Sequence, residues 1–326
     1  MITAGPSGSD EAAGRTAGAF ATLLEGGWTL PLPGAGATAQ RWTALSDLGA
    51  ADLPLARLAE GHADARAILA ELDGPDPGDG RRLGVWAAEP PSARLAARRA
   101  AGGWRLDGRK AWCSGARALT DALVTAEADD GRRLFLADLT GGGLRADPTV
   151  WAGPGMVASD TADVHFEDVP AVEVGGPGAY VDRPGFWHGG IGVAAVWAGG
   201  ARAVAARLLA TVAARTPDPL LAAALGAADV AVHSAAAALR DAAREVDAAP
   251  ADLAAARLRA LRVRALVARS VDDVLATVGR ALGAGPLAHD TEHAQRVADL
   301  AVYVRQHHGE RDLAGLGELL RAEAAS

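Results

Sequence analysis

The chain has 326 residues, a formal net charge of −8 at pH 7, a pI near 5.5 and one cysteine. This length is sufficient for a large buried core. The acidic balance argues against a nucleic-acid partner or an anionic membrane surface. The single Cys113 excludes an intrachain disulfide and a cysteine-based zinc site, and we expect it to be a small buried hydrophobe.

The first 80 residues are expected to be helical. Apolar residues recur at helical spacing over residues 11–25 and again over 45–72, where Pro54 suits a first helical turn. The turn-rich stretch 74–80 then ends this region.

Short apolar or alternating runs, separated by glycine and proline, follow from residue 81 to about residue 180. They predict an antiparallel β-domain. The expected strands are residues 83–87, 104–106, 110–114, 122–126, 133–138 and 163–166.

Long alanine-rich helical runs dominate from about residue 185 and predict a four-helix bundle. They cover residues 191–215, 220–247, 251–282 and 292–307. The fold class is therefore α+β, with three expected domains: a shortened helical domain (1–80), a middle β-domain (81–184) and a C-terminal helical bundle (185–326).

The N-terminus lacks the features of a secretory signal. No apolar run is judged to approach the roughly 20 residues that span a bilayer. We therefore expect a cytoplasmic protein without a membrane partner.

The segment from Trp104 to Ala126 is the most informative part of the chain. It is expected to form a β-hairpin with its turn at Asp107–Gly108, followed by a further strand. Trp112 and Ser114 are two residues apart, so their side chains are predicted to share one strand face. A flat aromatic ring beside a hydroxyl suits a planar, polar-edged ring such as a flavin; a buried tryptophan in a small β-domain is the alternative.

The stretch Gly108-Arg-Lys-Ala-Trp-Cys-Ser-Gly-Ala116 resembles the middle-domain signature of the acyl-CoA dehydrogenase superfamily. Further matches follow the expected order and extend the resemblance over roughly residues 45–312. The resemblance implies the same succession of helical domain, β-domain and four-helix bundle, here with a shorter first domain. These further matches are Ala88-Glu89-Pro90 and the stretches 158–170, 243–247 and 282–285.

The resemblance also implies FAD as the cofactor and assigns contacts to it. Trp112 packs near the isoalloxazine ring, and Ser114 hydrogen-bonds its reactive edge. Arg215 matches an arginine that reaches the pyrophosphate in a neighbouring subunit, although a helix-terminal arginine is the alternative. The remaining expected positions are Ala88 (in place of a threonine), Glu89, Gly283 and Gly285 for the cofactor, and Ser159 and His188 for the substrate. The two glycines also suit a simple helix stop, and no metal site is expected.

The catalytic base of an acyl-CoA dehydrogenase is usually a carboxylate that removes the α-proton. Arg305 or Gln306 stands at its C-terminal location, and Val193 stands near the alternative location. His307, His308 and Glu310 are therefore the candidate catalytic residues, since a histidine titrates near neutral pH. A solvated helix end is the alternative interpretation of this stretch.

Three functions remain open. The leading hypothesis is an FAD-dependent oxidoreductase that dehydrogenates an acyl thioester or related small molecule, with hydride transfer to flavin N5. The second is a flavin-dependent monooxygenase that receives reduced flavin from a partner reductase. The third is a non-catalytic subunit that pairs with an active homologue. A homo-oligomer, dimer or tetramer, and an electron-transfer or reductase partner are expected from the resemblance.

Overall fold

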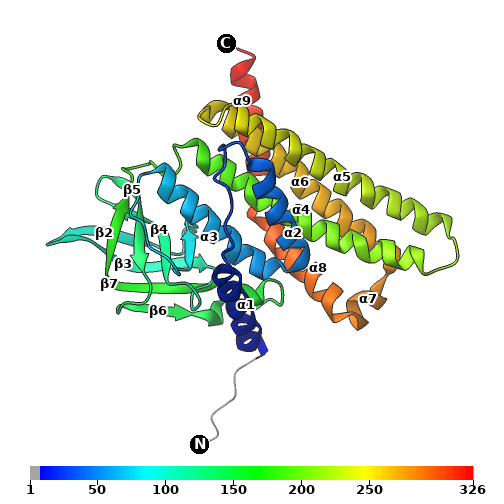
Figure 1. The fold of residues 1–326 in the computed structure, drawn as a ribbon, viewed down its shortest axis with the longest axis horizontal. Coiled ribbons are helices and arrows are strands. Elements are labelled where there is room, and N and C mark those ends of the chain that lie inside the picture. The colour runs from blue at the N-terminus through cyan, green and yellow to red at the C-terminus, as the bar shows by residue number, and fades with distance from the viewer. Residues whose placement is uncertain (1–7, 326) are drawn as a thin grey trace, which may run out of the picture. The chain divides into compact units, whose positions relative to one another are not determined.

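The computed structural model describes residues 8–325. The chain forms two structural units (Figure 1). The β unit contains the chain up to Thr29 together with Arg57–Gly153 and Val157–Phe186. The helical unit contains Leu30–Ala56, Pro154–Met156 and the chain from Trp187 onward.

Seven strands build the β unit, and their pairings close on themselves. The order β1-β4-β2-β3-β7-β5 is completed by a further pairing of β5 with β4, and β6 pairs with β7. Most pairs are antiparallel as expected, but β1 and β2 both run parallel to β4. The strands are β1 (Leu83–Trp86), β2 (Leu95–Ala100), β3 (Gly103–Cys113), β4 (Asp121–Ala128), β5 (Gly131–Asp138), β6 (Leu144–Asp147) and β7 (Ala162–Val174).

Helix α3 (Leu53–Glu71) covers this sheet with an apolar face. Its Ala65, Ile68 and Leu69 pack against strand residues of β1, β4, β5 and β7, all of them buried. Each fully buried leucine or isoleucine contributes about 1.5–3 kcal/mol, so this contact is a main source of the unit's stability. The strand partners are Leu83, Leu123, Leu134 and Val174. The unit also holds α1 (Gly8–Glu25) and two short 3-10 helices, η1 (Pro148–Val150) and η2 (Val157–Ser159).

The expected hairpin turn at Asp107–Gly108 is wrong. Strand β3 runs through both residues, and its hairpin partner is β2, which the sequence did not reveal. Gly108 has φ +122°, and a Cβ there would lie 2.5 Å from the carbonyl oxygen of Arg94. The register with β7 shifts between Leu106 and Gly108, so the Asp-Gly pair marks a β-bulge and not a turn.

The helical unit is built around three 30-residue helices that run alongside one another (Figure 1). Helices α4, α5, α6 and α8 correspond to the four helices expected in the C-terminal bundle, while α7 and α9 were not expected. Helix α2, expected in the first domain, belongs to this unit as well. The bounds are α2 (Thr38–Ala51), α4 (Pro184–Ala213), α5 (Pro219–Ala248), α6 (Leu253–Leu282), α7 (Ala284–His289), α8 (Thr291–Tyr303), the 3-10 helix η3 (Val304–Gln306) and α9 (Glu310–Glu323).

The single helix expected over residues 45–72 is two helices, α2 and α3. Asp52 ends α2 in an extended conformation, and its Oδ1 accepts a hydrogen bond from the Leu55 N–H at 2.8 Å. Its carboxylate therefore caps the start of α3, where Pro54 occupies the first turn as expected.

Helices α4 and α5 are long and apolar enough, by length and composition alone, to cross a membrane. The expectation that no apolar run approaches this length is therefore wrong. In α4 the apolar window is 56 % buried inside the structure, as in a core helix, and in α5 only 11 % is buried. One or two such helices occur in many soluble folds, so they do not assign the chain to a membrane.

Candidate functional site

Trp112 occupies a strained position at the end of β3. Its φ is +61°, a conformation that bulky side chains rarely adopt, and the register with β7 shifts between Lys110 and Cys113. The indole is 56 % exposed and meets Trp151 edge to face, with ring centroids 5.6 Å apart. Such an outlier persists only where its surroundings impose it. The end of β3 around Trp112, Ser114 and Trp151, called the corner below, is therefore a candidate functional site.

The bulge interrupts the regular strand alternation that would place Trp112 and Ser114 on one face. Cys113 between them is fully buried, as expected, and burial raises the pKa of its thiol. Ser114 is also buried, at 9 % exposure. The corner therefore combines an exposed indole with a buried hydroxyl, instead of two side chains in one environment.

Ser114 belongs to a cluster of three buried hydroxyls, the hydroxyl cluster (Ser114, Ser159 and Thr161). Thr161 Oγ1 lies 2.9 Å from Ser114 Oγ and 2.8 Å from Ser159 Oγ. The Gly115 N–H donates to the Ser159 carbonyl at 2.8 Å and joins the two segments. A chain in which Ser159 donates to Thr161, and Thr161 to Ser114, leaves the Ser114 O–H available to an outside acceptor.

Asp160 lies between Ser159 and Thr161 and pairs with Arg117. Its carboxylate accepts from the Arg117 backbone N–H at 2.8 Å and from Arg117 Nε at 2.7 Å. Arg117 also donates to Asp10 of α1 at 2.8 Å. Asp160 has φ +50°, so this ion pair holds a second strained residue close to the hydroxyl cluster.

The Glu89 carboxylate is bound by side chains of the β unit. The buried Lys110, the only lysine of the chain, donates to the Thr125 carbonyl and hydroxyl oxygens at 2.7 Å each. The Thr125 hydroxyl donates to Glu89 at 2.5 Å, and Lys110 Nζ lies 3.6 Å from the same carboxylate. Burial lowers the pKa of Lys110 to about 8, which Glu89 partly opposes. Arg132 also pairs with Glu89, so this carboxylate stabilises strands, while the neighbouring Ala88 offers only a methyl group.

In the helical unit, no carboxylate stands at the positions expected for the base of a dehydrogenase. Arg305 is exposed and pairs with Asp272. The Gln306 carbonyl accepts from Arg264 at 3.0 Å. Val193 lies half-buried within α4. None of these side chains can remove a proton from carbon.

The histidine pair lies between η3 and α9. The Gly309 N–H donates to His307 Nδ1 at 3.2 Å, while His307 Nε2 lies 3.7 Å from Asp312. Burial lowers the pKa of His307, so the ring is neutral at pH 7 and its basic lone pair already accepts this bond. His308 is 65 % exposed, and its backbone N–H donates to Asp312 at 3.1 Å. Glu310 is exposed in the first turn of α9.

The other predicted residues are distributed over the helical unit. His188 is buried, and its Nε2 lies 3.1 Å from the Pro250 carbonyl oxygen. Arg215 is exposed in the connection after α4. Gly283 ends α6 with φ +65°, so the helix-stop interpretation is confirmed, and Gly285 follows in α7. Between residues 8 and 325, no group of three or more histidine, cysteine or acidic side chains could hold a metal ion.

The sequence did not identify two residues of the corner, Thr161 and Trp151, as site residues. Thr161 was visible in the Ser-Asp-Thr motif, but its central place in the hydroxyl cluster depends on contacts across 47 residues. Trp151 had no local signal, because its ring meets Trp112 only through the folded β unit.

No protein-family model matches the chain, and no curated protein matches it by sequence. Solved structures do match over nearly their whole length. The dibenzothiophene monooxygenase TdsC from Paenibacillus sp. A11-2, solved with FMN and indole, has a TM-score of 0.76 at 16 % identity, covering 96 % of each chain. KijD3, solved with FMN and a dTDP-linked amino keto sugar, has 0.74 at 19 %, covering 97 % of this chain and 91 % of its own. A nitrososynthase from Micromonospora carbonacea var. africana has 0.72 at 20 %, covering 98 % of each.

At these identities the comparison establishes the fold and nothing finer. The chain has an acyl-CoA dehydrogenase-like α+β fold, with N-terminal helices, a middle β region and a C-terminal helical region. The fold class expected from the sequence is confirmed.

Proposed function

We propose that the chain is a flavin-dependent monooxygenase that receives reduced flavin from a partner reductase. The observation that carries the proposal is the strained, exposed Trp112 beside the buried hydroxyl cluster. The TdsC and KijD3 structures hold FMN, which supports FMN, in place of the FAD expected from the sequence, as the cofactor.

The residues of the corner fit the ring of a flavin. The exposed indole of Trp112 offers an apolar surface to a flat ring, and Trp151 supports it from the side. The hydroxyl cluster offers a donor to a polar ring edge through the Ser114 O–H. Arg117 balances part of the charge of Asp160, because it pairs with both Asp160 and Asp10. In this proposal Trp112 holds the ring and Ser114 orients it.

The missing carboxylate favours oxygen transfer over dehydrogenation. Removal of an α-proton needs an ionised base, and Arg305, Gln306 and Val193 stand at the two expected positions. His307 does not replace it in this proposal, because its lone pair accepts from Gly309. A bound reduced flavin supplies the electrons that activate dioxygen, a reaction that needs no carbon-directed base. The protein's part is then to bind the ring, exclude water with the tryptophan pair, and hold a proton at Ser114.

The proposal is tested with purified protein and reduced flavin supplied by a separate flavin reductase and NADH. Indole, bound in a TdsC structure, serves as the probe substrate. We expect ¹⁸O from labelled dioxygen in the product, and tighter binding of FMN than of FAD. Trp112→Ala is expected to weaken flavin binding at least tenfold. Val172→Ala, which truncates another exposed side chain of the same unit, serves as the matched control and is expected to leave binding unchanged.

Two outcomes contradict the proposal. Anaerobic bleaching of bound flavin by an acyl-CoA would restore the dehydrogenase hypothesis. Failure to bind either flavin, in protein whose circular dichroism shows an intact fold, would favour a non-catalytic subunit.

A further inference from the structure

A cavity of about 220 Å³ lies within the helical unit, between α2, α4 and α5. Its walls are mostly apolar and include the indole of Trp42, which is 2 % exposed, and the buried Leu239. Alanines from all three helices leave the space open, because longer side chains at these positions would fill it. They are Ala39 of α2, Ala198 of α4 and Ala236 of α5.

Polar contacts on either side of the cavity fix its walls. At one end, Asp247 of α5 accepts from the Thr38 hydroxyl at 2.6 Å and from the N–H groups of Gly36 and Thr38 at 3.1 Å each. This carboxylate caps the first turn of α2 from another helix. Arg202 of α4 pairs with Asp47 of α2 at 2.7 Å. The cavity is therefore already formed without a ligand, which lowers the cost of binding.

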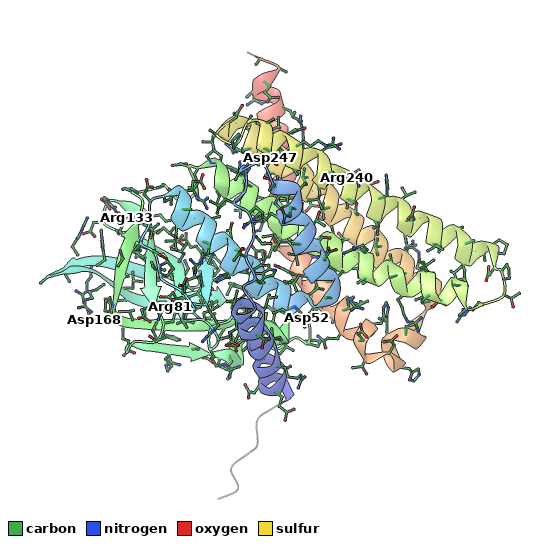
Figure 2. All side chains as sticks on the ribbon, in the orientation of Figure 1. Asp52, Arg81, Arg133, Asp168, Arg240 and Asp247 are labelled. Carbon is green, nitrogen blue, oxygen red and sulfur yellow. The ribbon has the colours of Figure 1, made fainter. Side chains whose placement is uncertain are left out.

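The rim of the cavity carries an excess of positive charge. Arg202 and Arg240 contribute two guanidinium groups and Asp47 one carboxylate. The Asp47 carboxylate pairs with Arg202. Within the described part of the chain, Arg240 has no hydrogen-bond or ion-pair partner, and it projects from α5 about two turns before Asp247 (Figure 2). An unpaired guanidinium at the edge of an apolar space favours an anion whose other end is apolar.

We propose that this cavity binds a single-ring aromatic carboxylate, with the ring against the half-buried Val232 and Ala236 and the carboxylate on Arg240. The size fits this class, because a cavity of about 150 Å³ accommodates benzene. The site is independent of the flavin proposal, since it needs neither cofactor nor turnover.

The test is calorimetric titration of the full chain, without flavin, with benzoate and with benzylamine, which has a similar shape and the opposite charge. We expect benzoate to bind at least tenfold more tightly than benzylamine. Arg240→Gln is expected to remove this preference, whereas Arg244→Gln, on the same helix and paired with Asp241, is expected to retain it. Ala236→Leu is expected to abolish binding by filling the cavity, and Ala227→Leu on the exposed surface of α5 serves as its control.

Several results would overturn the inference. Equal affinities for benzoate and benzylamine would remove the role of Arg240, as would unchanged benzoate binding in Arg240→Gln. Binding that survives in Ala236→Leu would locate the ligand elsewhere. Thermal unfolding of each variant separates a filled cavity from a damaged fold, since a folded Ala236→Leu variant retains a cooperative transition.

Discussion

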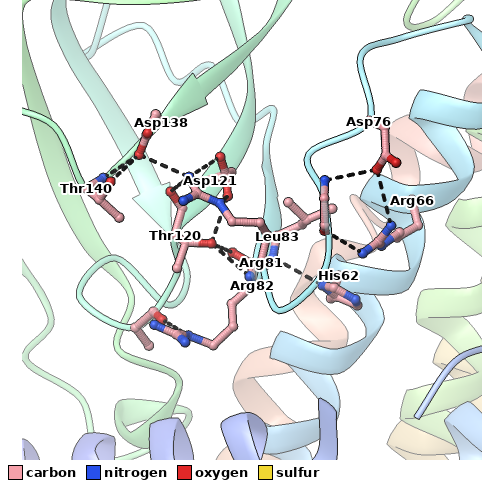
Figure 3. A network of polar contacts seen from close by, with 12 residues as sticks. His62, Arg66, Asp76, Arg81, Arg82, Leu83, Thr120, Asp121, Asp138 and Thr140 are labelled. Atoms are coloured by element: carbon pink, nitrogen blue, oxygen red, sulfur yellow. Dashed lines mark hydrogen bonds and ion pairs between the residues drawn. The ribbon is translucent and has the colours of Figure 1, made fainter. Parts of the chain in front are cut away.

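Acid should destabilise the β unit through His62, a buried histidine of α3. Figure 3 shows its ring facing the start of β1, where Nδ1 accepts a hydrogen bond from the Leu83 N–H at 3.1 Å. Burial, with a smaller contribution from Arg66, lowers the pKa of His62 from 6.5 to about 4. The ring is 7 % exposed and packs edge-on against Phe20, so a charge there would be poorly solvated.

The sign and size of the effect follow from proton linkage. Between pH 6.5 and about pH 4, the unfolded chain binds a proton at His62 and the folded chain does not. Unfolding is therefore favoured as the pH falls through this window, and below it the loss is constant. At 1.36 kcal/mol for each pKa unit, this group removes about 3 kcal/mol from the free energy of unfolding.

His62→Asn isolates the effect, because an asparagine carbonyl oxygen can accept the Leu83 N–H bond without titrating. Urea unfolding, followed by circular dichroism at several pH values from 7 to 4, gives the free energy of unfolding of each chain. The native chain is expected to lose about 3 kcal/mol more than His62→Asn over this range. His233→Asn, which removes an exposed imidazole of α5, is the control. A difference between native chain and His62→Asn that stays constant with pH would refute the reasoning.

Three further predictions concern other buried or strained residues. Because burial lowers the pKa of Lys110 to about 8, the free energy of unfolding should rise by about 3 kcal/mol between pH 8 and 10.5, and Lys110→Met should lack this rise in urea titrations. Gly199→Ala should lower the free energy of unfolding by about 1–3 kcal/mol, because the new Cβ would lie 1.9 Å from the Ser46 carbonyl oxygen. Gly226→Ala, with no atom within 4 Å, should raise it by about 0.5–1 kcal/mol in the same assay. Trp112→Gly should change stability by less than about 1 kcal/mol, since relieved strain offsets the lost ring contact, yet weaken flavin binding at least tenfold in fluorescence titrations.

The parts of the fold that local chemistry determines were predictable. Asp218 and Asp252 cap α5 and α6, and proline follows Asp218, so composition marks where these helices begin. Strand β2 was missed because Leu95–Ala100 contains only leucine, alanine and arginine, with no β-branched or aromatic residue. Its strand conformation depends on pairing with β3. Strand β6 was missed for the same reason, since its four residues form a strand only beside β7.

In the candidate site too, features set by local sequence were predictable and features set by tertiary contacts were not. The motif around Trp112 and Ser114 predicted the part of the β unit that we propose as the site, because residue types and their order are local information. The left-handed backbone of Trp112 and its contact with Trp151 depend on tertiary packing, so no two-residue spacing could reveal them. The role of Glu89 was obscured in the same way, since its partner Thr125 lies 36 residues away.

The protonation states of the β unit bear on which flavin chemistry the chain can support. Lys110 and His62 are titratable but enclosed, and their hydrogen bonds go to strand groups. Asp160 is held in place by Arg117, whose backbone N–H and Nε both donate to its carboxylate. In the proposed function, the Ser114 hydroxyl at the end of the hydroxyl cluster is the group that holds a proton toward a bound ring. A site with a proton donor and without a base suits oxygen transfer, which is why the proposal rests on Ser114 and Trp112 together. Thr161→Val would test that link, because it breaks the chain of hydroxyls behind Ser114 while leaving the exposed indole unchanged.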